Sequence, residues 1–160
     1  MSETVQIKAP WLASKDPEVP STLNYSTLSM CGRVEEMVRQ YPNYTAYEFM
    51  GKTTTYAEMW QKINACAKSL KAIGIREGDK VTICMPNAPQ TLCMFYAVNM
   101  VGAIANMVHP LSAESEISFY LRDSNSVAAI TLDQFYDKFE HIRQNTGIIN
   151  IIIASVKDAL

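Results

Sequence analysis

Two polar side chains, Asn87 and His109, each follow an apolar run of strand length. Ligand sites of α/β proteins lie at such strand ends. Asn87 follows the apolar run 81–85 and could either cap a helix starting at Pro89 or form one wall of a pocket. His109 follows the apolar run 105–108, and its ring could contact a substrate carboxylate. A histidine at a turn with no acid nearby to orient it is more often structural. Both residues are therefore candidates for a substrate pocket, and the sequence favours a cap for Asn87 and a structural role for His109.

Other kinds of chemistry find no support in the residue pattern. Cys31, Cys66, Cys84 and Cys93 form no CxxC pair and have no histidine at zinc-finger spacing, so we expect buried thiols and no metal site. The glycines are too far apart for a phosphate cradle, and no G-x-x-x-x-G-K-[ST] motif is present. Without a G-x-S-x-G elbow or a cysteine placed beside a base, no catalytic residue is assigned. Residues that would bind a cofactor are equally unknown.

Composition and charge exclude several classes of protein. The 160 residues fit one domain, and 14 basic against 16 acidic side chains give a net charge of -2. Because nucleic-acid binding needs clustered Lys and Arg, we expect no nucleic-acid partner. No apolar run reaches membrane-spanning length, and the first residues lack the apolar core of a signal peptide. These features predict a cytoplasmic protein.

Apolar periodicity predicts alternating strands and helices. After an expected hairpin at 44–55, a T-x-x-E capping box at Thr55 and Glu58 should start a helix with Trp60, Ile63 and Leu70 facing the sheet. We expect helices at 31–41, 55–73, 89–101, 113–122 and 134–143, and strands at 81–85, 105–108, 127–131 and 148–153. Strands separated by helices need crossover connections, so the sheet should be parallel and doubly wound, with helices on both faces.

Two regions follow from this reading. Residues 1–30, rich in Pro and Ser, are expected to form an irregular arm lying over the domain, with apolar residues such as Trp11 and Leu12 available to pin it down. Residues 31–160 should form the α/β subdomain. The nearly all-apolar helix at 91–101 suggests an exposed apolar surface, through which the chain could form a homo-oligomer unless the arm covers it.

Five phrases in a fixed order carry a family resemblance. The segments TTYAEM, GIREGDKV, MPNAPQ, FYAVNMVGAIANMVHPLS and EISFYLRDS lie between residues 42 and 139 and resemble the acyl-CoA synthetases, a family of adenylate-forming enzymes. The resemblance implies the N-terminal subdomain of such an enzyme. In the intact family enzyme, ATP with Mg²⁺ converts a carboxylic acid to an acyl-adenylate, and coenzyme A then displaces AMP. His109 could contact the pantetheine group of coenzyme A in this setting.

The same resemblance limits what the chain is expected to do alone. The family's Ser/Thr/Gly-rich phosphate loop ending in Lys has no counterpart before Leu160, so we expect the subdomain 31–160 to stop short of that loop. We expect this fragment to bind no cofactor and to be inactive by itself. The alternative is a stand-alone α/β binding or interaction module without catalysis.

Overall fold

Four short strands form a parallel sheet at the centre of the computed structural model, which describes residues 9–159. They are β3 (Lys80–Cys84), β4 (Ile104–Met107), β5 (Ser126–Leu132) and β6 (Asn150–Ala154), paired in the order β4-β3-β5-β6. The predicted strands lie within a residue or two of these bounds. The parallel sheet of the predicted α/β class is thereby confirmed.

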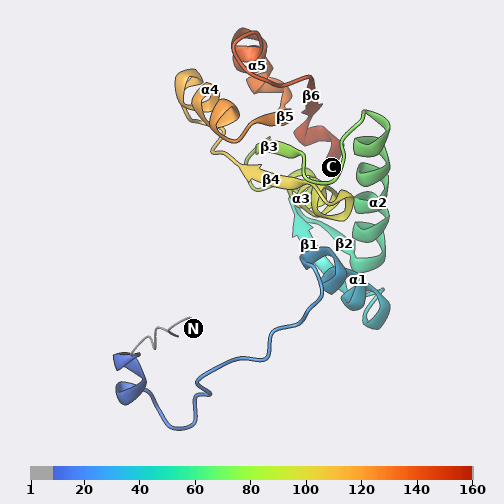
Figure 1. Cartoon of the computed structure of the whole chain (residues 1–160). Coiled ribbons are helices and arrows are strands. Elements are labelled where there is room, and N and C mark those ends of the chain that lie inside the picture. The colour runs from blue at the N-terminus through green and yellow to red at the C-terminus, as the bar shows by residue number, and fades with distance from the viewer. Residues whose placement is uncertain (1–8, 160) are drawn as a thin grey trace.

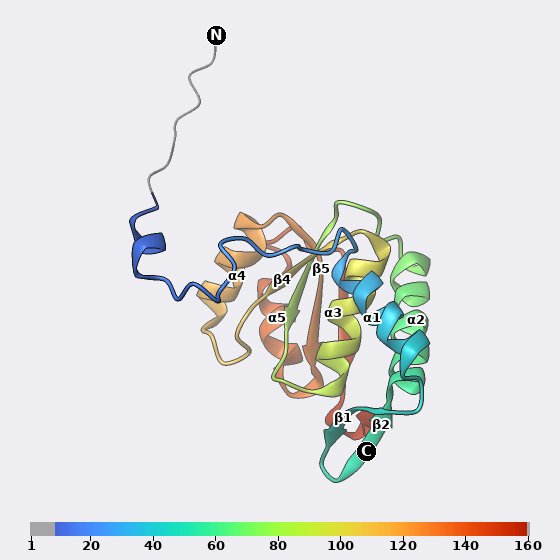
Figure 2. The ribbon, with the colours of Figure 1, turned by 90° about the horizontal axis from the view of Figure 1, so that it is seen from below.

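Helices cover both faces of this sheet, as Figure 2 shows with the strands between two helical layers. On one face, Val81, Ile83 and Ile130 pack with α2 (Tyr56–Ala72) and α3 (Pro89–Val101). On the other face, Cys84 and Ala129 pack with α4 (Glu114–Asp123) and α5 (Tyr136–Arg143). Alternate residues of each strand thus enter opposite cores, which explains why the strands are apolar throughout. The doubly wound arrangement is confirmed.

A hairpin and a capped helix precede the sheet. Strands β1 (Thr45–Phe49) and β2 (Lys52–Thr55) pair antiparallel, and the capping box forms as predicted. The Glu58 carboxylate accepts the Thr55 N–H at 2.8 Å, and Thr55 Oγ1 accepts the Glu58 N–H at 3.3 Å. Both bonds satisfy backbone donors that the first turn of a helix leaves unpaired.

The buried stripe of α2 differs from the predicted one. Ile63 and Leu70 are fully buried, as predicted, but their neighbours on the stripe are Met59 and Ala67. Trp60 is only partly buried at the margin of the core. Residues 59, 63, 67 and 70 follow the helical spacing of three and four, whereas Trp60 lies one position, or about 100°, away from Met59.

Helix α3 is largely covered, and the apolar surface predicted at 91–101 is reduced to half-buried residues such as Leu92 and Tyr96, which line an open groove. Every residue of α3 is described, and none is exposed. Helix α1 (Met30–Gln40) and helix α2 cover the side of α3 that faces away from the sheet. The Cys31 N–H donates to Asn99 Oδ1 at 2.9 Å and fixes α1 to the end of α3. An all-apolar helix fits such a buried layer.

A left-handed glycine ends α3. Gly102 has φ +82°, and the Ala103 N–H returns to the Val98 carbonyl at 3.0 Å. A Cβ at Gly102 would lie 3.0 Å from Cγ of Glu77. Gly102 therefore has an architectural role, at the end of α3.

The N-terminal arm does not lie over the domain, which corrects the sequence-based expectation. Figure 1 shows residues 9–29 leaving the body, with only a short 3₁₀ turn, η1 (Pro10–Ser14). Every residue from 10 to 29 is exposed except the half-buried Lys15. Trp11 and Leu12 do not attach the arm to the domain, since no residue from 10 to 29 is buried. Residues 1–8 of the expected arm lie outside the described residues.

A hydrogen-bonded polar cluster links three strands of the sheet. Thr82 Oγ1 and Ser126 Oγ lie 2.7 Å apart, and both residues are buried. The Asn106 amide donates to Thr82 Oγ1 at 3.0 Å and to Ser124 Oγ at 3.1 Å. Ser124 Oγ lies 2.8 Å from Ser126 Oγ. The cluster joins β4, β3, β5 and the end of α4, and its hydrogen bonds offset the cost of burying these polar groups.

Two further 3₁₀ turns lie in the C-terminal part of the described residues. The turn η2 (Asp133–Phe135) precedes α5, which therefore begins at Tyr136 rather than at the predicted Gln134. The turn η3 (Val156–Ala159) follows β6. Among residues 9–159, no helix combines the length and the apolar character needed to cross a membrane.

Candidate functional site

A cavity of about 530 Å³ opens at the carboxyl edge of the sheet. The segments that follow β3, β4 and β5 form its walls, because parallel strands deliver their ends to the same edge. The lining residues are Met85, Pro86, Asn87, Met107, Val108, His109, Pro110, Leu111, Gln134 and Phe135. The two residues singled out from the sequence, Asn87 and His109, thus line one cavity although 22 positions separate them.

Hydrogen bonds hold the His109 ring at the rim of this cavity. Its Nδ1 accepts the Leu111 N–H at 3.3 Å, so in this contact the ring proton is carried by Nε2. Its carbonyl accepts the Ser112 N–H at 3.1 Å. His109 is exposed, and its Nε2–H is a donor that can be offered to an anionic oxygen.

Asn87 is not the cap of α3, which corrects the favoured structural reading. The N-cap is Ala88, with no capping bond from a side chain, and Pro89 at the first helical position has no N–H to satisfy. Thr91 Oγ1 instead donates to the Pro86 carbonyl at 2.6 Å and ties the turn to the helix. The Asn87 amide is exposed and lines the cavity, with a donor and an acceptor available.

One basic side chain, Lys138, lies close to the cavity. Lys138 Nζ donates to the Ser112 carbonyl at 3.2 Å and lies 5.5 Å from the centre of the Phe135 ring. It therefore joins the segments after β4 and β5 at the rim. None of the lining residues is acidic. This combination favours an anionic ligand with an apolar body, since most of the walls are apolar.

Nucleophilic thiol chemistry is disfavoured throughout the described chain. Burial raises the pKa of the Cys84 thiol, below the cavity floor, to about 11, although the positive charge of Lys138 opposes this shift. Burial also raises the pKa of Cys93 to about 11, and it raises the pKa of Cys31 and of Cys66. Since the thiolate is the reactive form, these cysteines act as small apolar side chains. Among residues 9–159, no cluster of three or more His, Cys, Asp or Glu side chains could hold a metal ion.

Sequence reasoning missed the wall contributed by Gln134 and Phe135. These residues follow β5 directly, and their placement after an apolar strand was a usable signal of the same kind as for Asn87 and His109. Their position after a strand was hidden because both residues also fit the helical pattern expected at 134–143. The structure places them in η2, at the cavity.

Comparisons with known proteins agree with one another. The model of the family described as AMP-binding enzyme matches residues 34–159. A long-chain-fatty-acid–CoA ligase from Bacillus subtilis is 31% identical over 156 residues, which cover 98% of this chain and 28% of the ligase. The chain therefore spans little more than a quarter of that relative.

Solved structures show the same architecture. The N-terminal domain of FACL13 from Mycobacterium tuberculosis superposes with a TM-score of 0.71 at 31% identity, over 76% of this chain and 32% of that one. A long-chain-fatty-acid–CoA ligase from Archaeoglobus fulgidus superposes with a TM-score of 0.77 over 86% of this chain and 30% of that one. At 19% identity the latter match speaks for the fold alone. With a family model covering most of its length and a fold shared with these N-terminal regions, the chain belongs to the AMP-binding family of adenylate-forming, ATP-using enzymes and corresponds to their N-terminal part.

Proposed function

We propose that this chain serves as the N-terminal portion of an ATP-dependent acyl-CoA synthetase acting on a long-chain carboxylic acid. The family match over residues 34–159, together with the Bacillus subtilis ligase, is the observation that carries this proposal. In the proposed reaction a carboxylate oxygen attacks the α-phosphorus of ATP and releases pyrophosphate. The thiol of coenzyme A then attacks the acyl carbon, and AMP leaves. Mg²⁺ would accompany ATP, and a cytoplasmic location is part of the same proposal.

Within that enzyme, we assign residues 31–160 to a subdomain that forms one wall of the acid-binding pocket. The cavity at the carboxyl edge combines apolar walls with the His109 Nε2–H, the Asn87 amide and the nearby Lys138 ammonium. A hydrogen bond from a neutral donor to a carboxylate is stronger than one between two neutral groups. The cavity is therefore suited to hold a carboxylate at its rim and part of an alkyl chain against its walls.

This assignment predicts that the chain binds a free fatty acid weakly at the cavity. Titration with decanoate, followed by two-dimensional NMR, should shift the amide signals of Asn87, His109 and Leu111. The substitution His109→Ala should weaken this binding about tenfold, because it removes a hydrogen bond to a charged group. His141→Ala is the matched control, since the exposed His141 side chain pairs instead with Glu114 on α4 at 3.5 Å. Equal affinities of the two variants, or shifts confined to other regions, would reject the assignment.

The second expectation is that the chain alone does not perform the first chemical step. No phosphate-binding loop ending in Lys occurs in the sequence, so ATP lacks the donors that usually hold its phosphates. Isothermal titration with ATP and magnesium should give no saturable heat, and decanoate should stimulate no pyrophosphate release. Saturable micromolar binding of ATP would contradict this expectation while leaving the family assignment intact.

A further inference from the structure

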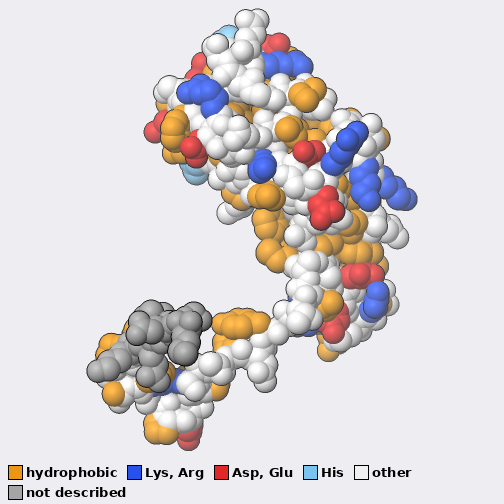
Figure 3. Space-filling model, viewed as in Figure 1, with side chains coloured by type: hydrophobic (Ala, Val, Ile, Leu, Met, Phe, Trp, Pro, Cys, Tyr) orange, Lys and Arg blue, Asp and Glu red, His pale blue; other side chains and the backbone are white. Residues whose placement is uncertain are grey.

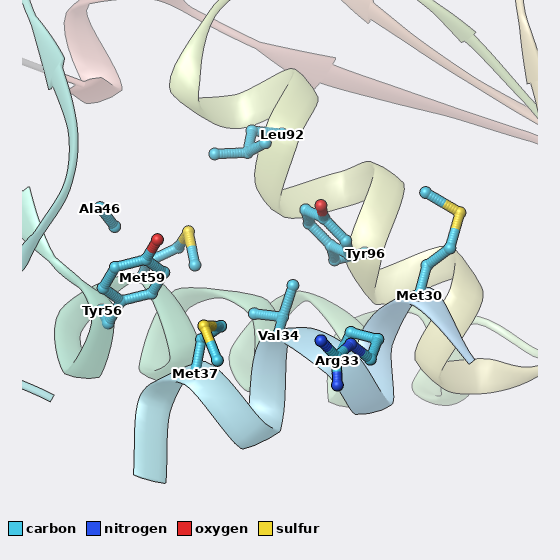
Figure 4. Close-up of a pocket in the computed structure, with 9 residues that line it drawn as sticks. All are labelled: Met30, Arg33, Val34, Met37, Ala46, Tyr56, Met59, Leu92 and Tyr96. Carbon is cyan, nitrogen blue, oxygen red and sulfur yellow. The ribbon is translucent and has the colours of Figure 1, made fainter. Parts of the chain in front are cut away.

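An open apolar groove lies on the side of α3 that faces away from the sheet, between α1, α2, α3 and the hairpin. Figure 4 shows side chains from these elements converging on it. Its apolar walls include Val34, Met37, Met59 and Leu92. Its volume of about 390 Å³ lies within the range of about 300–1,000 Å³ that is usual for small-molecule sites. No described residue lines both this groove and the cavity at the carboxyl edge, so the two are separate sites.

The polar side chains that line the groove can all donate a hydrogen bond. They are the guanidinium of Arg33 and the hydroxyls of Tyr56 and Tyr96, and among the described residues no carboxylate lines the groove. Arg33 lies in the first turn of α1, so its charge stands at one end of the groove (Figure 4). Its Nη1 donates to the carboxylate of Glu36. A guanidinium carries five N–H donors, so this ion pair leaves donors for a second acceptor.

The apolar part of the groove suits a flexible chain. Met59 is buried in the core of α2 and α3 and forms a fixed part of the wall, whereas Met37 on α1 is half-buried. Methionine side chains are unbranched and adapt to irregular shapes, which an alkyl chain with many rotamers presents.

The described part of the N-terminal arm leaves the groove uncovered. Figure 3 shows the segment 9–29 standing clear of the body, and none of its residues lines the groove. A ligand can therefore enter from solution.

We propose that this groove binds a single-chain anionic amphiphile, with its alkyl tail along Met37 and Met59 and its anionic head at the guanidinium of Arg33. The donor groups complement the charge of the head, and the apolar walls receive the tail. A free fatty acid is the simplest ligand of this class, and it is bound here without chemical change. The proposal is independent of the proposed enzymatic activity, because it uses other residues than the cavity at the carboxyl edge.

Glu36 is a built-in competitor for the head group. Its carboxylate, on a side chain 39% exposed, already accepts from Arg33, and its negative charge repels a second anion nearby. Removal of the guanidinium should therefore weaken binding, and removal of the Glu36 carboxylate should strengthen it. A purely structural role of the ion pair would give both substitutions the same sign, since either one breaks the same contact.

Two-dimensional NMR of the full chain, with decanoate as the probe, tests the site. Saturable shifts are expected at the amide signals of Met37, Met59 and Tyr96. Arg33→Gln should raise the dissociation constant measured from these signals about threefold, and Glu36→Gln should lower it about threefold, as expected for exposed charges.

Arg39→Gln is the matched control for the change of charge. Arg39 lies on the same helix and pairs with Glu35 at 2.7 Å, but it does not line the groove. This variant should leave the dissociation constant unchanged.

A ligand series tests tail and head separately. Hexanoate, octanoate and decanoate should bind progressively more tightly, by up to about fourfold for each methylene that the groove buries. Decanol has the tail of decanoate without the charge, so it should bind the wild type and Arg33→Gln with equal affinity.

Several results would overturn the proposal. They are equal effects of Arg33→Gln and Arg39→Gln, weaker binding by Glu36→Gln, and an affinity independent of chain length. Shifts confined to Asn87, His109 and Leu111 would overturn it while supporting the acid-binding pocket proposed above, whereas shifts confined to the groove would support it and reject that pocket. Shifts of the groove signals on raising the protein concentration alone would assign the groove to a second copy of the chain and would equally overturn the proposal.

Discussion

The substitution Phe139→Ala is expected to lower the free energy of unfolding by about 3–5 kcal/mol. Phe139 on α5 is fully buried and packs in the second core with Leu121, Ala129 and Ile142. Removal of its ring loses the burial of a large apolar side chain and leaves a cavity that the short helix α5 cannot fill. Since domains of this size are stabilised by about 5–15 kcal/mol, the loss is a large part of the total.

Urea denaturation followed by circular dichroism measures this effect. Phe119→Ala provides the matched control, because Phe119 lies on α4 with its side chain exposed. We expect the control to change the free energy of unfolding by less than about 1 kcal/mol. Similar effects for both substitutions would show that α4 and α5 do not cover the sheet as described.

A second large effect is expected on the opposite face of the sheet. Ile63→Ala should lower the free energy of unfolding by about 2–5 kcal/mol. Ile63 lies on α2 and is fully buried in the core that α2 and α3 form with the sheet. Trp60→Ala, in contrast, should cost less than Ile63→Ala despite the larger side chain, because Trp60 is only partly buried. Ile73→Ala at the end of α2 controls for the substitution itself, since Ile73 is exposed.

The comparison is made by thermal and urea unfolding of all three variants. A larger loss for Trp60→Ala than for Ile63→Ala would contradict the buried stripe of Met59, Ile63, Ala67 and Leu70. It would support the orientation predicted from the sequence, with Trp60 facing the sheet.

The order and type of the elements were predictable because local signals agree with the final packing. The capping box at Thr55, the proline at 89 and the glycine at 102 mark helix ends through backbone chemistry that needs no tertiary contact. The apolar strands separated by helices likewise imply a parallel sheet with two covered faces. These features hold wherever the segment is placed, and they explain why the predicted bounds of α3 match the observed ones.

What the sequence could not show is which elements cover which. The apolar pattern of α3 is equally compatible with a helix buried inside the domain and one that awaits a partner, and only the docking of α1 and α2 decides. The position of the arm is undetermined for the same reason, since apolar residues such as Trp11 do not specify their contact surface. Asn87 and His109 were placed at the correct sheet edge, but their common cavity depends on the order of the strands. Their role in binding stays a prediction.

The polar cluster of Thr82, Asn106, Ser124 and Ser126 helps to fix the alignment of the strands during folding. Because β3 and β5 are apolar on both faces, sliding one past the other by two residues would keep most apolar groups buried. Such a slide would break the hydrogen bond between the hydroxyls of Thr82 and Ser126, so that Thr82 would keep only Asn106 and Ser126 only Ser124 as a partner in the interior. Misaligned pairings therefore carry a penalty that the apolar residues alone do not impose. Four small polar side chains, Thr82, Asn106, Ser124 and Ser126, thus select one alignment of three strands from several that bury almost the same surface.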